Sequence, residues 1–184
     1  MMRGRIPTGI LLLALAGIVA AGDAPGERRS GPAWKTFRSS AGGFRMVIPG
    51  APKRTLSHHV SFIGTITDHI FIAAAGDQVF TLDYSDLPGF AVDFAGADTI
   101  YDHAKGALLS QTCSRVVSFQ DFTQNGMSGK DLVYETPPAP GKPKLYGQAR
   151  FFLVGHRLYV IDAAVPAGDS EALARRFLDG VSFD

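Results

Sequence analysis

The stretch FFLVGHRLYVIDAAV, residues 151–165, predicts the centre of the fold. It consists of two apolar runs separated by Gly155-His156, which is typical of two antiparallel strands joined by a tight turn. Apolar residues occupy both alternate sets of positions in each run. Because successive side chains of a strand point to opposite faces of a sheet, both faces of this hairpin are expected to be buried. The sequence therefore predicts a central strand pair, Leu145–Val154 and Arg157–Val165.

Further strand and helix signals lie on both sides of this hairpin. Asn125-Gly126 is a strong turn signal between two alternating runs, and two segments carry apolar residues at helical spacing. The expected order is four strands, a helix, four strands and a helix. Because hairpins dominate, we expect an α+β fold with a mostly antiparallel β-sheet and helices packed on it. Besides the central pair, the expected strands are 44–48, 55–62, 65–74, 78–86, 115–122 and 127–136, and a short extended piece that begins at Phe37 precedes them.

The two expected helices have recognisable ends. Asp98 is a plausible N-cap for the first helix, over residues 98–110, and Asp169 or Ser170 for the second, which ends at Gly180. Residues 89–96 read as a loop, and we expect its Phe90, Val92 and Phe94 to tuck under the first helix. Any sheet face that helices leave open would have to be covered by loops, by oligomer contacts or by a partner, so an open face would be a docking surface.

The beginning of the chain has the features of a secretory signal peptide. Arg3 and Arg5 precede an apolar run over residues 10–21, and small residues follow it. We expect residues 1–22 to be the signal peptide, residues 23–33 a flexible linker and residues 34–184 a single domain. The protein is then exported, to the periplasm or the cell exterior. An uncleaved anchor is the alternative, although the apolar run is short for a span of about 20 residues.

Charge and cysteine content narrow the classes of function. Without its first 22 residues the chain keeps 16 basic and 17 acidic residues, a net charge of −1 with neutral histidines. This balance argues against nucleic-acid binding, which needs a basic face. Cys113 is the single cysteine, so no internal disulfide can form, and we expect its side chain to be a small buried hydrophobe.

The segment HHVSFIGTITDH, His58–His69, is the one histidine-rich stretch. If Ile63-Gly64 form the turn of a hairpin, His59 lies opposite Asp68 on one face, and His58 lies opposite His69 on the other. The four side chains then do not converge, whereas a structural zinc site needs four ligands and a catalytic one three. We expect two cross-strand polar pairs. A metal site that uses His58 and His69 stays as the minor alternative.

No catalytic motif stands out, and no cofactor is expected. Phosphate-binding loops, HExxH and CxxC are absent, and Gly126–Gly129 is one residue short of GxSxG. Asp83 and Asp86 could pose as the paired carboxylates of a glycosidase, but a strand end followed by a turn explains them better. Asp121, Asp131 and Glu135 are expected at outward strand positions.

Several short motifs together resemble a known group. They are F-x-S-x-x-G-G-F-R-x-x-x-P-G-x-P from Phe37, Y-S-D-L-P from Tyr84, G-x-x-G-K-D-L from Gly126, R-F-F-L-V-G-x-R-L-Y from Arg150, and the terminal F-L-D from Phe177. The pattern resembles exported bacterial proteins of unknown function with a PsbP-like α/β/α sandwich. That fold is shared by the extrinsic subunit of the oxygen-evolving complex and a Ran-binding import factor. The resemblance covers residues 34–184 and implies a non-enzymatic role, with no catalytic residue to carry over.

These observations predict an exported binding or accessory module of the cell envelope that has no catalytic activity. The expected partner is an envelope protein. Nucleic acid is not expected as a partner, nor is a stable membrane span after cleavage, and the oligomeric state stays open. The alternatives are a binder of a small ligand or metal that uses the 58–69 hairpin, and a hydrolase.

Overall fold

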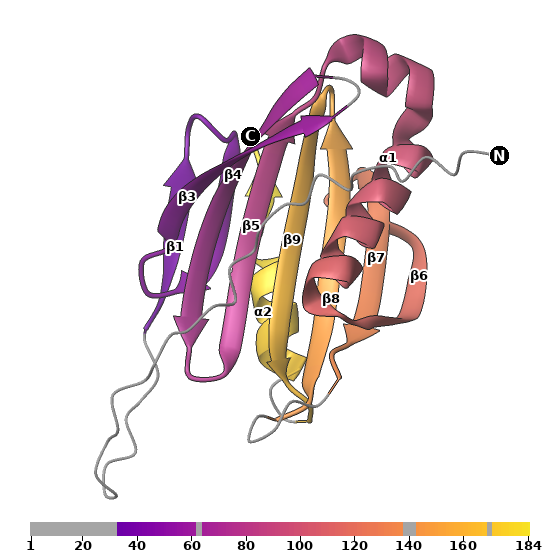
Figure 1. Cartoon of the computed structure of the whole chain (residues 1–184). Helices are drawn as coiled ribbons and strands as arrows, with labels where there is room; N and C mark the ends of the chain where they lie inside the picture. The colour runs from indigo at the N-terminus through magenta and orange to yellow at the C-terminus, as the bar shows by residue number, and fades with distance from the viewer. Residues whose placement is uncertain (1–32, 62–63, 138–142, 169–170) are drawn as a thin grey trace, which may run out of the picture.

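A computed structural model describes residues 33–61, 64–137, 143–168 and 171–184 (Figure 1). The expected signal peptide, nearly all of the expected linker, Ile63 of the expected turn, and the expected caps Asp169 and Ser170 lie outside these ranges. The described residues form, in chain order, β1 (Trp34–Ser39), β2 (Phe44–Pro49), β3 (Lys53–Ser61), β4 (Gly64–Ala75), β5 (Gln78–Asp86), α1 (Gly89–Thr112), β6 (Arg115–Gln124), β7 (Met127–Glu135), β8 (Leu145–Val154), β9 (Arg157–Pro166), α2 (Glu171–Asp179) and β10 (Ser182–Phe183).

A seven-stranded antiparallel sheet is the centre of the molecule, with the strand order β3-β4-β5-β9-β8-β7-β6. The hairpin of β8 and β9 lies inside it, and Phe151 and Phe152, which point to opposite faces, are both fully buried. This confirms the expected central pair. The β6–β7 turn is confirmed as well. Asn125 and Gly126 both have positive φ, 51° and 80°, which a type I′ hairpin turn requires.

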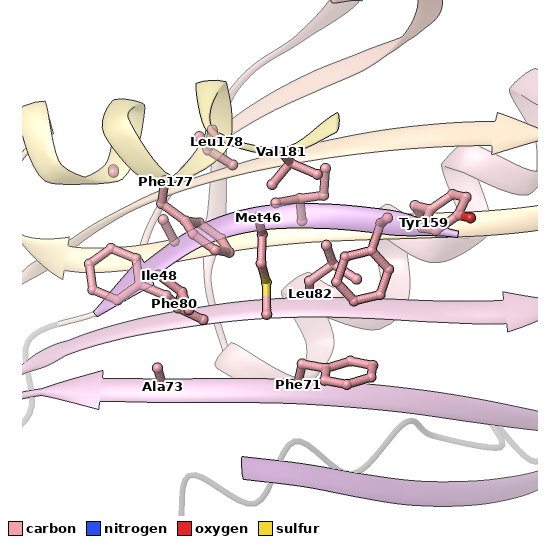
Figure 2. Packing of buried hydrophobic residues seen from close by; sticks show 14 of the residues in the cluster. Met46, Ile48, Phe71, Ala73, Phe80, Leu82, Tyr159, Phe177, Leu178 and Val181 are labelled. Carbon is pink, nitrogen blue, oxygen red and sulfur yellow. The ribbon is translucent and has the colours of Figure 1, made fainter. Parts of the chain in front are cut away.

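One face of this sheet is covered by α2 and by a small three-stranded sheet of the order β1-β2-β10. Met46 and Ile48 of β2 point toward the large sheet, where they meet Phe80 and Leu82 of β5 (Figure 2). The helix α2 is amphipathic and adds Phe177 with its neighbours to the same core. Deep burial of these side chains is the main stabilising term on this face.

The opposite face is covered by α1, which crosses β7 and β8 in front of the sheet while α2 lies behind it (Figure 1). Tyr101 and Leu108 of α1 pack on Leu132, Tyr134 and Phe151. The described part of the chain is thus mostly antiparallel β-sheet with helices packed on it, an α+β fold as expected. No helix in this part is both long and apolar enough to cross a bilayer.

The expected loop over residues 89–96 is wrong, because α1 already begins at Gly89. Gly96, with φ 74° and ψ 160°, interrupts the helical backbone and divides it into two segments. This conformation is open to glycine and strained for other residues. The first segment therefore does not continue along the sheet. Phe90 and Phe94, expected under the helix, are instead 64% and 93% exposed.

Three smaller expectations are corrected. Five strands, not four, precede α1, and a short β10 follows α2. Asp98 lies within α1 rather than at its N-cap. Cys113 is exposed and not buried, because it caps the C-terminal end of α1 in the left-handed conformation, with its N–H directed at Ser110. A capping residue outside the last turn leaves the packed face of its helix, so its side chain faces solvent.

The register of β3 and β4 differs from the expected one by two residues. Ser61 pairs with Gly64, so His58 lies opposite Thr67 and His59 opposite Ile66. Because a shift of two keeps every side chain on its face, His58 and His69 still share one face, and His59 and Asp68 the other. The faces were therefore right and the directly opposite residues wrong, although the expected His59–Asp68 pair still forms diagonally, with 3.1 Å between Nδ1 and Oδ2.

Candidate functional site

A cleft of about 340 Å³ opens at one end of the large sheet. The β8–β9 turn, the end of β5, the β1–β2 turn and the last residues of the chain meet there. Its lining consists of Gly43, Asp86, Val154, His156, Arg157, Tyr159, Phe183 and Asp184. The start of α1 and the C-terminus both lie at this end of the molecule (Figure 1). The cleft is therefore built from four segments far apart in the sequence.

Arg157 is the central charged group of the cleft. Its Nε and Nη2 donate to the two carboxylate oxygens of Asp86, at 2.6 and 2.8 Å, and its Nη1 donates to the carbonyl oxygen of Ala41 at 2.9 Å. The guanidinium also lies 4.6 Å from the ring centre of Tyr84. The hydrogen bonds from Arg157 lower the pKa of Asp86. A bidentate arginine–carboxylate pair has a well-defined geometry, so Arg157 and Asp86 fix the position of each other's side chains.

Tyr159 and the end of the chain close the cleft on its other side. The Tyr159 hydroxyl donates to the carbonyl oxygen of Gly42 at 2.6 Å, and the backbone N–H of Asp184 donates to that of Gly43 at 2.9 Å. Phe183 packs on the Tyr159 ring, with 4.3 Å between ring centres. These bonds join the β1–β2 turn and β10 to the central sheet, which makes this wall of the cleft preformed.

His156, at the β8–β9 turn, lies between the cleft and the start of α1. The carbonyl oxygen of His156 accepts a hydrogen bond from the backbone N–H of Leu87 at 2.8 Å. The His156 ring lies against Gly89, so close that a Cβ there would be 3.0 Å from it. Phe90 comes directly after this contact, and Phe94 follows one helical turn later. The start of α1 therefore lies beside the cleft, and the exposed pair follows directly after this contact in the sequence.

The histidines of the 58–69 hairpin each have a separate partner. His58 Nδ1 lies 2.9 Å from Thr67 Oγ1, and His69 Nδ1 lies 3.1 Å from Arg54 Nη2. The ring of His69 is stacked on Tyr84, with 4.5 Å between ring centres. Burial of the imidazole, and next the charge of Arg54, lower the pKa of His69. Within the described ranges, no three His, Cys, Asp or Glu side chains are grouped so that they could hold a metal ion.

A serine, a histidine and an aspartate do meet on the other face, but in an order unsuited to catalysis. Asp68 lies between the two others. It accepts from the Ser85 hydroxyl through Oδ1, and its Oδ2 lies 3.1 Å from His59 Nδ1. In a nucleophilic triad the imidazole must contact the hydroxyl in order to take its proton. Here the carboxylate occupies that place, and Ser85 is buried.

The expected carboxylates are placed in three different ways. Asp83 and Asp86 point to opposite faces of β5, so they do not flank a common cleft. Asp121 is at an exposed position, as expected. Asp131 is buried, contrary to the expectation, because it accepts from Gln148 at 2.8 Å and from Arg150 at 3.3 Å. These two donors make its burial possible.

Sequence reasoning did not identify the cleft. Asp86 and Arg157 are 71 residues apart, and they meet only because β5 and β9 are neighbours in the sheet. The register of that pair places Asp86 directly opposite Arg157. An opposite-charge pair at the two strand ends is the one signal that could have suggested the contact, and it requires knowledge of the strand order.

Comparisons with known proteins support the fold. No family model and no curated protein matches the chain. Among solved structures, that of cyanobacterial PsbP (CyanoP) from Synechocystis sp. PCC 6803 is similar with a TM-score of 0.58 at 10% identity. The match covers 91% of this chain and 100% of that one. PA94 from Pseudomonas aeruginosa, a protein of unknown function, has a TM-score of 0.38 at 13% identity, over 76% of this chain and 87% of its own. The similarity to CyanoP shows that the chain has a PsbP-like fold.

Proposed function

We propose that this protein is a non-catalytic binding or accessory module, exported to the cell envelope, and that a partner protein docks at the end of the sheet where the cleft opens. We also propose that its layers correspond to the PsbP-like α/β/α sandwich, with β1, β2 and β10 added on the side of α2. The observation that carries the proposal is the exposed aromatic pair, Phe90 and Phe94, beside a preformed cleft.

Exposed phenylalanines at this position are costly without a function. A phenylalanine that is 93% exposed contributes nothing to the core, and two in adjacent helical turns present a continuous apolar surface. The surrounding wall is rigid, because Arg157 and Tyr159 are fixed by hydrogen bonds to Asp86 and Gly42. Buried aromatic anchors beside a preformed pocket are typical of protein interfaces.

Site-specific photo-crosslinking in the producing cells tests this proposal. A benzoylphenylalanine would replace Phe94, and a second protein would carry it at Val60. Val60 is 77% exposed on the edge strand β3 and serves as the matched control. We expect one discrete protein adduct from position 94 and none of that mass from position 60. Adducts from neither position, or the same adducts from both, would contradict docking at this end.

A double substitution, F90S/F94S, provides the second test. We expect the adduct from a crosslinker at the neighbouring position 93 to be lost, since the apolar anchors are gone. The free energy of unfolding should change by less than about 0.5 kcal/mol, because substitutions of well-exposed side chains rarely do more. Urea unfolding measures this. An adduct that persists in a folded double variant would assign the contact to other residues.

A further inference from the structure

Three aspartates form a diagonal row on the face of the sheet that α1 partly covers. Asp68 of β4 lies opposite Ser85 of β5, and Asp162 of β9 lies opposite Thr81 of β5. Asp83 is between Ser85 and Thr81 on the same face. It is therefore the diagonal neighbour of both other carboxyl groups, at a distance of roughly 7–8 Å between Cα atoms. All three are at least nine-tenths buried.

Apolar side chains flank Asp83 on the two neighbouring strands, while Thr81 and Ser85 lie on either side of it along β5. Ile70 lies opposite Asp83 on one side and Val160 on the other, and Ile66 and Leu158 continue the two flanks. Ile70 is almost completely buried. A carboxylate in such surroundings loses its hydration without gaining an equivalent contact, unless a cation or several donors replace the water.

The charged and titratable groups that face the row do not supply such a replacement. Across from Asp68 are the His59 ring of β3 and the Ser85 hydroxyl. From β7, the Tyr134 hydroxyl donates to Asp162 Oδ1 at 2.8 Å. From α1, the titratable side chain in the same core is Tyr101, whose hydroxyl oxygen accepts from the Leu153 N–H. No lysine or arginine among the described residues contacts these aspartates.

Asp83 and Asp162 differ from Asp68 in how few contacts they have. The Oδ1 atom of Asp83 is buried and has no hydrogen-bond partner in the described part of the chain. Burial, and next the charge of Asp68, raise the pKa of Asp83 well above its ordinary value. Burial also raises the pKa of Asp162, to about 7, although the Tyr134 hydroxyl opposes this. Asp162 therefore favours the neutral form below about pH 7, and Asp83 stays neutral to a higher pH than an ordinary carboxyl group.

We propose that the Asp68–Asp83–Asp162 row is a proton-sensitive device: the packed sheet face is stable while Asp83 and Asp162 carry protons, and it loosens when they lose them. The row, not one residue, has this property, because the charge of Asp68 disfavours a second negative charge on Asp83. The sign of the pH effect follows from the coupling between proton binding and folding. A carboxyl group with a raised pKa binds more protons in the folded state, so stability falls as the pH rises from its ordinary pKa of 3.8 to its folded value.

Unfolding in urea between pH 5 and 7 tests the proposal with matched variants. D83N, D162N and the double variant replace each carboxyl group by a neutral amide of the same shape. D77N, at an exposed position in the β4–β5 turn, is the control. In the unchanged protein and in D77N, the ratio of folded to unfolded molecules should fall about tenfold per pH unit for each proton lost. The pH dependence of stability that comes from Asp83 and Asp162 should be absent in the double variant. Equal slopes in all of them would overturn the proposal.

Local opening is tested separately. Ala164, a mostly buried residue on the same face of β9, is replaced by cysteine in a C113S background. After correction for thiol ionisation, its rate of labelling should increase at least about tenfold from pH 5 to 7, and less than twofold with D83N/D162N added. A rate that does not respond to pH would overturn the opening step. Should the variants fail to fold, infrared absorption of the unchanged protein decides. We expect a band of a protonated carboxylic acid at pH 6, and its absence would refute the proposal.

Discussion

At the scale of single residues, close packing decides which small side chains this sequence needs. Gly147 of β8 lies under the ring of Tyr134, and a Cβ at this position would be 2.1 Å from the nearest ring atom. The ring is fixed, because its hydroxyl is bonded to Asp162 and its faces are buried. A side chain at position 147 would thus have to displace the centre of the α1-side core. The glycine is required by its neighbour and not by its own backbone conformation.

We therefore expect G147A to lower the free energy of unfolding by about 1–3 kcal/mol, the usual cost of overpacking a core. G106A is the matched control. Gly106 is an exposed position of α1 with nothing within 4 Å of its would-be Cβ. There alanine should raise the free energy of unfolding by up to about 1 kcal/mol, through its higher helix propensity. Urea unfolding of both variants measures the opposite signs, and equal signs would contradict this account of the packing.

At the scale of elements, a network of polar side chains connects α2 with β6, β7 and β8, the strands at one edge of the large sheet. Arg150 of β8, whose side chain is only 6% exposed, donates to Asp131 of β7 and, at 2.7 Å, to Asp179 at the end of α2. It also donates to Gln124 of β6, whose amide in turn donates to the carbonyl oxygen of Leu178. Three strands and the last turn of α2 therefore depend on one guanidinium group.

R150A should lower the free energy of unfolding by about 3–5 kcal/mol, because it leaves Asp131 buried without its cation. The control is R38A, which removes an ion pair with Asp184 at the surface and should change stability by no more than about 1 kcal/mol. Thermal and urea unfolding compare the two. A loss in R150A as small as that in R38A would mean that the network does not support α2.

The elements also show which parts of this fold can be predicted from sequence. The hairpins and the helix α2 follow from alternation, turn residues and spacing, which are local properties. The first segment of α1 does not. Phe90 and Phe94 have the composition of core residues, and their exposure results from the backbone turn at Gly96. The contact of Asp86 with Arg157 depends on strand order, and the burial of Asp131 depends on donors from another strand. Local patterns contain neither kind of information.

At the scale of the whole molecule, two groups of titratable side chains on opposite faces of the sheet act in opposite directions. Asp83 and Asp162, on the side of α1, stabilise the fold more as the pH falls toward 4. His69, on the side of α2, has a pKa below its ordinary value of 6.5. The folded state therefore favours neutral His69, and this contribution to stability is lost as the pH falls through 6.5 toward the lower folded pKa.

The carboxyl groups whose pKa values are lowered do not change the stability between pH 5 and 7. Asp86, Asp102 and Glu135 have ordinary pKa values of 3.8 or 4.5, and their ion pairs hold the folded values still lower. Their contribution to stability is complete above those ordinary values and is lost only at more acidic pH. Among the groups with a shifted pKa, His69 and the two buried aspartates therefore dominate the pH dependence between 5 and 7.

The unchanged protein should consequently become more stable as the pH falls from 7 to 5, but less steeply than the two buried aspartates alone would make it, because His69 acts in the opposite direction. In H69Q, which keeps a polar side chain near Arg54 but cannot take up a proton, stability should rise steadily as the pH falls from 7 to 5. In D83N/D162N it should fall over the same interval. Urea midpoints at five pH values distinguish these shapes. Parallel profiles for H69Q and the unchanged protein would show that the stacked imidazole on Tyr84 is not linked to folding.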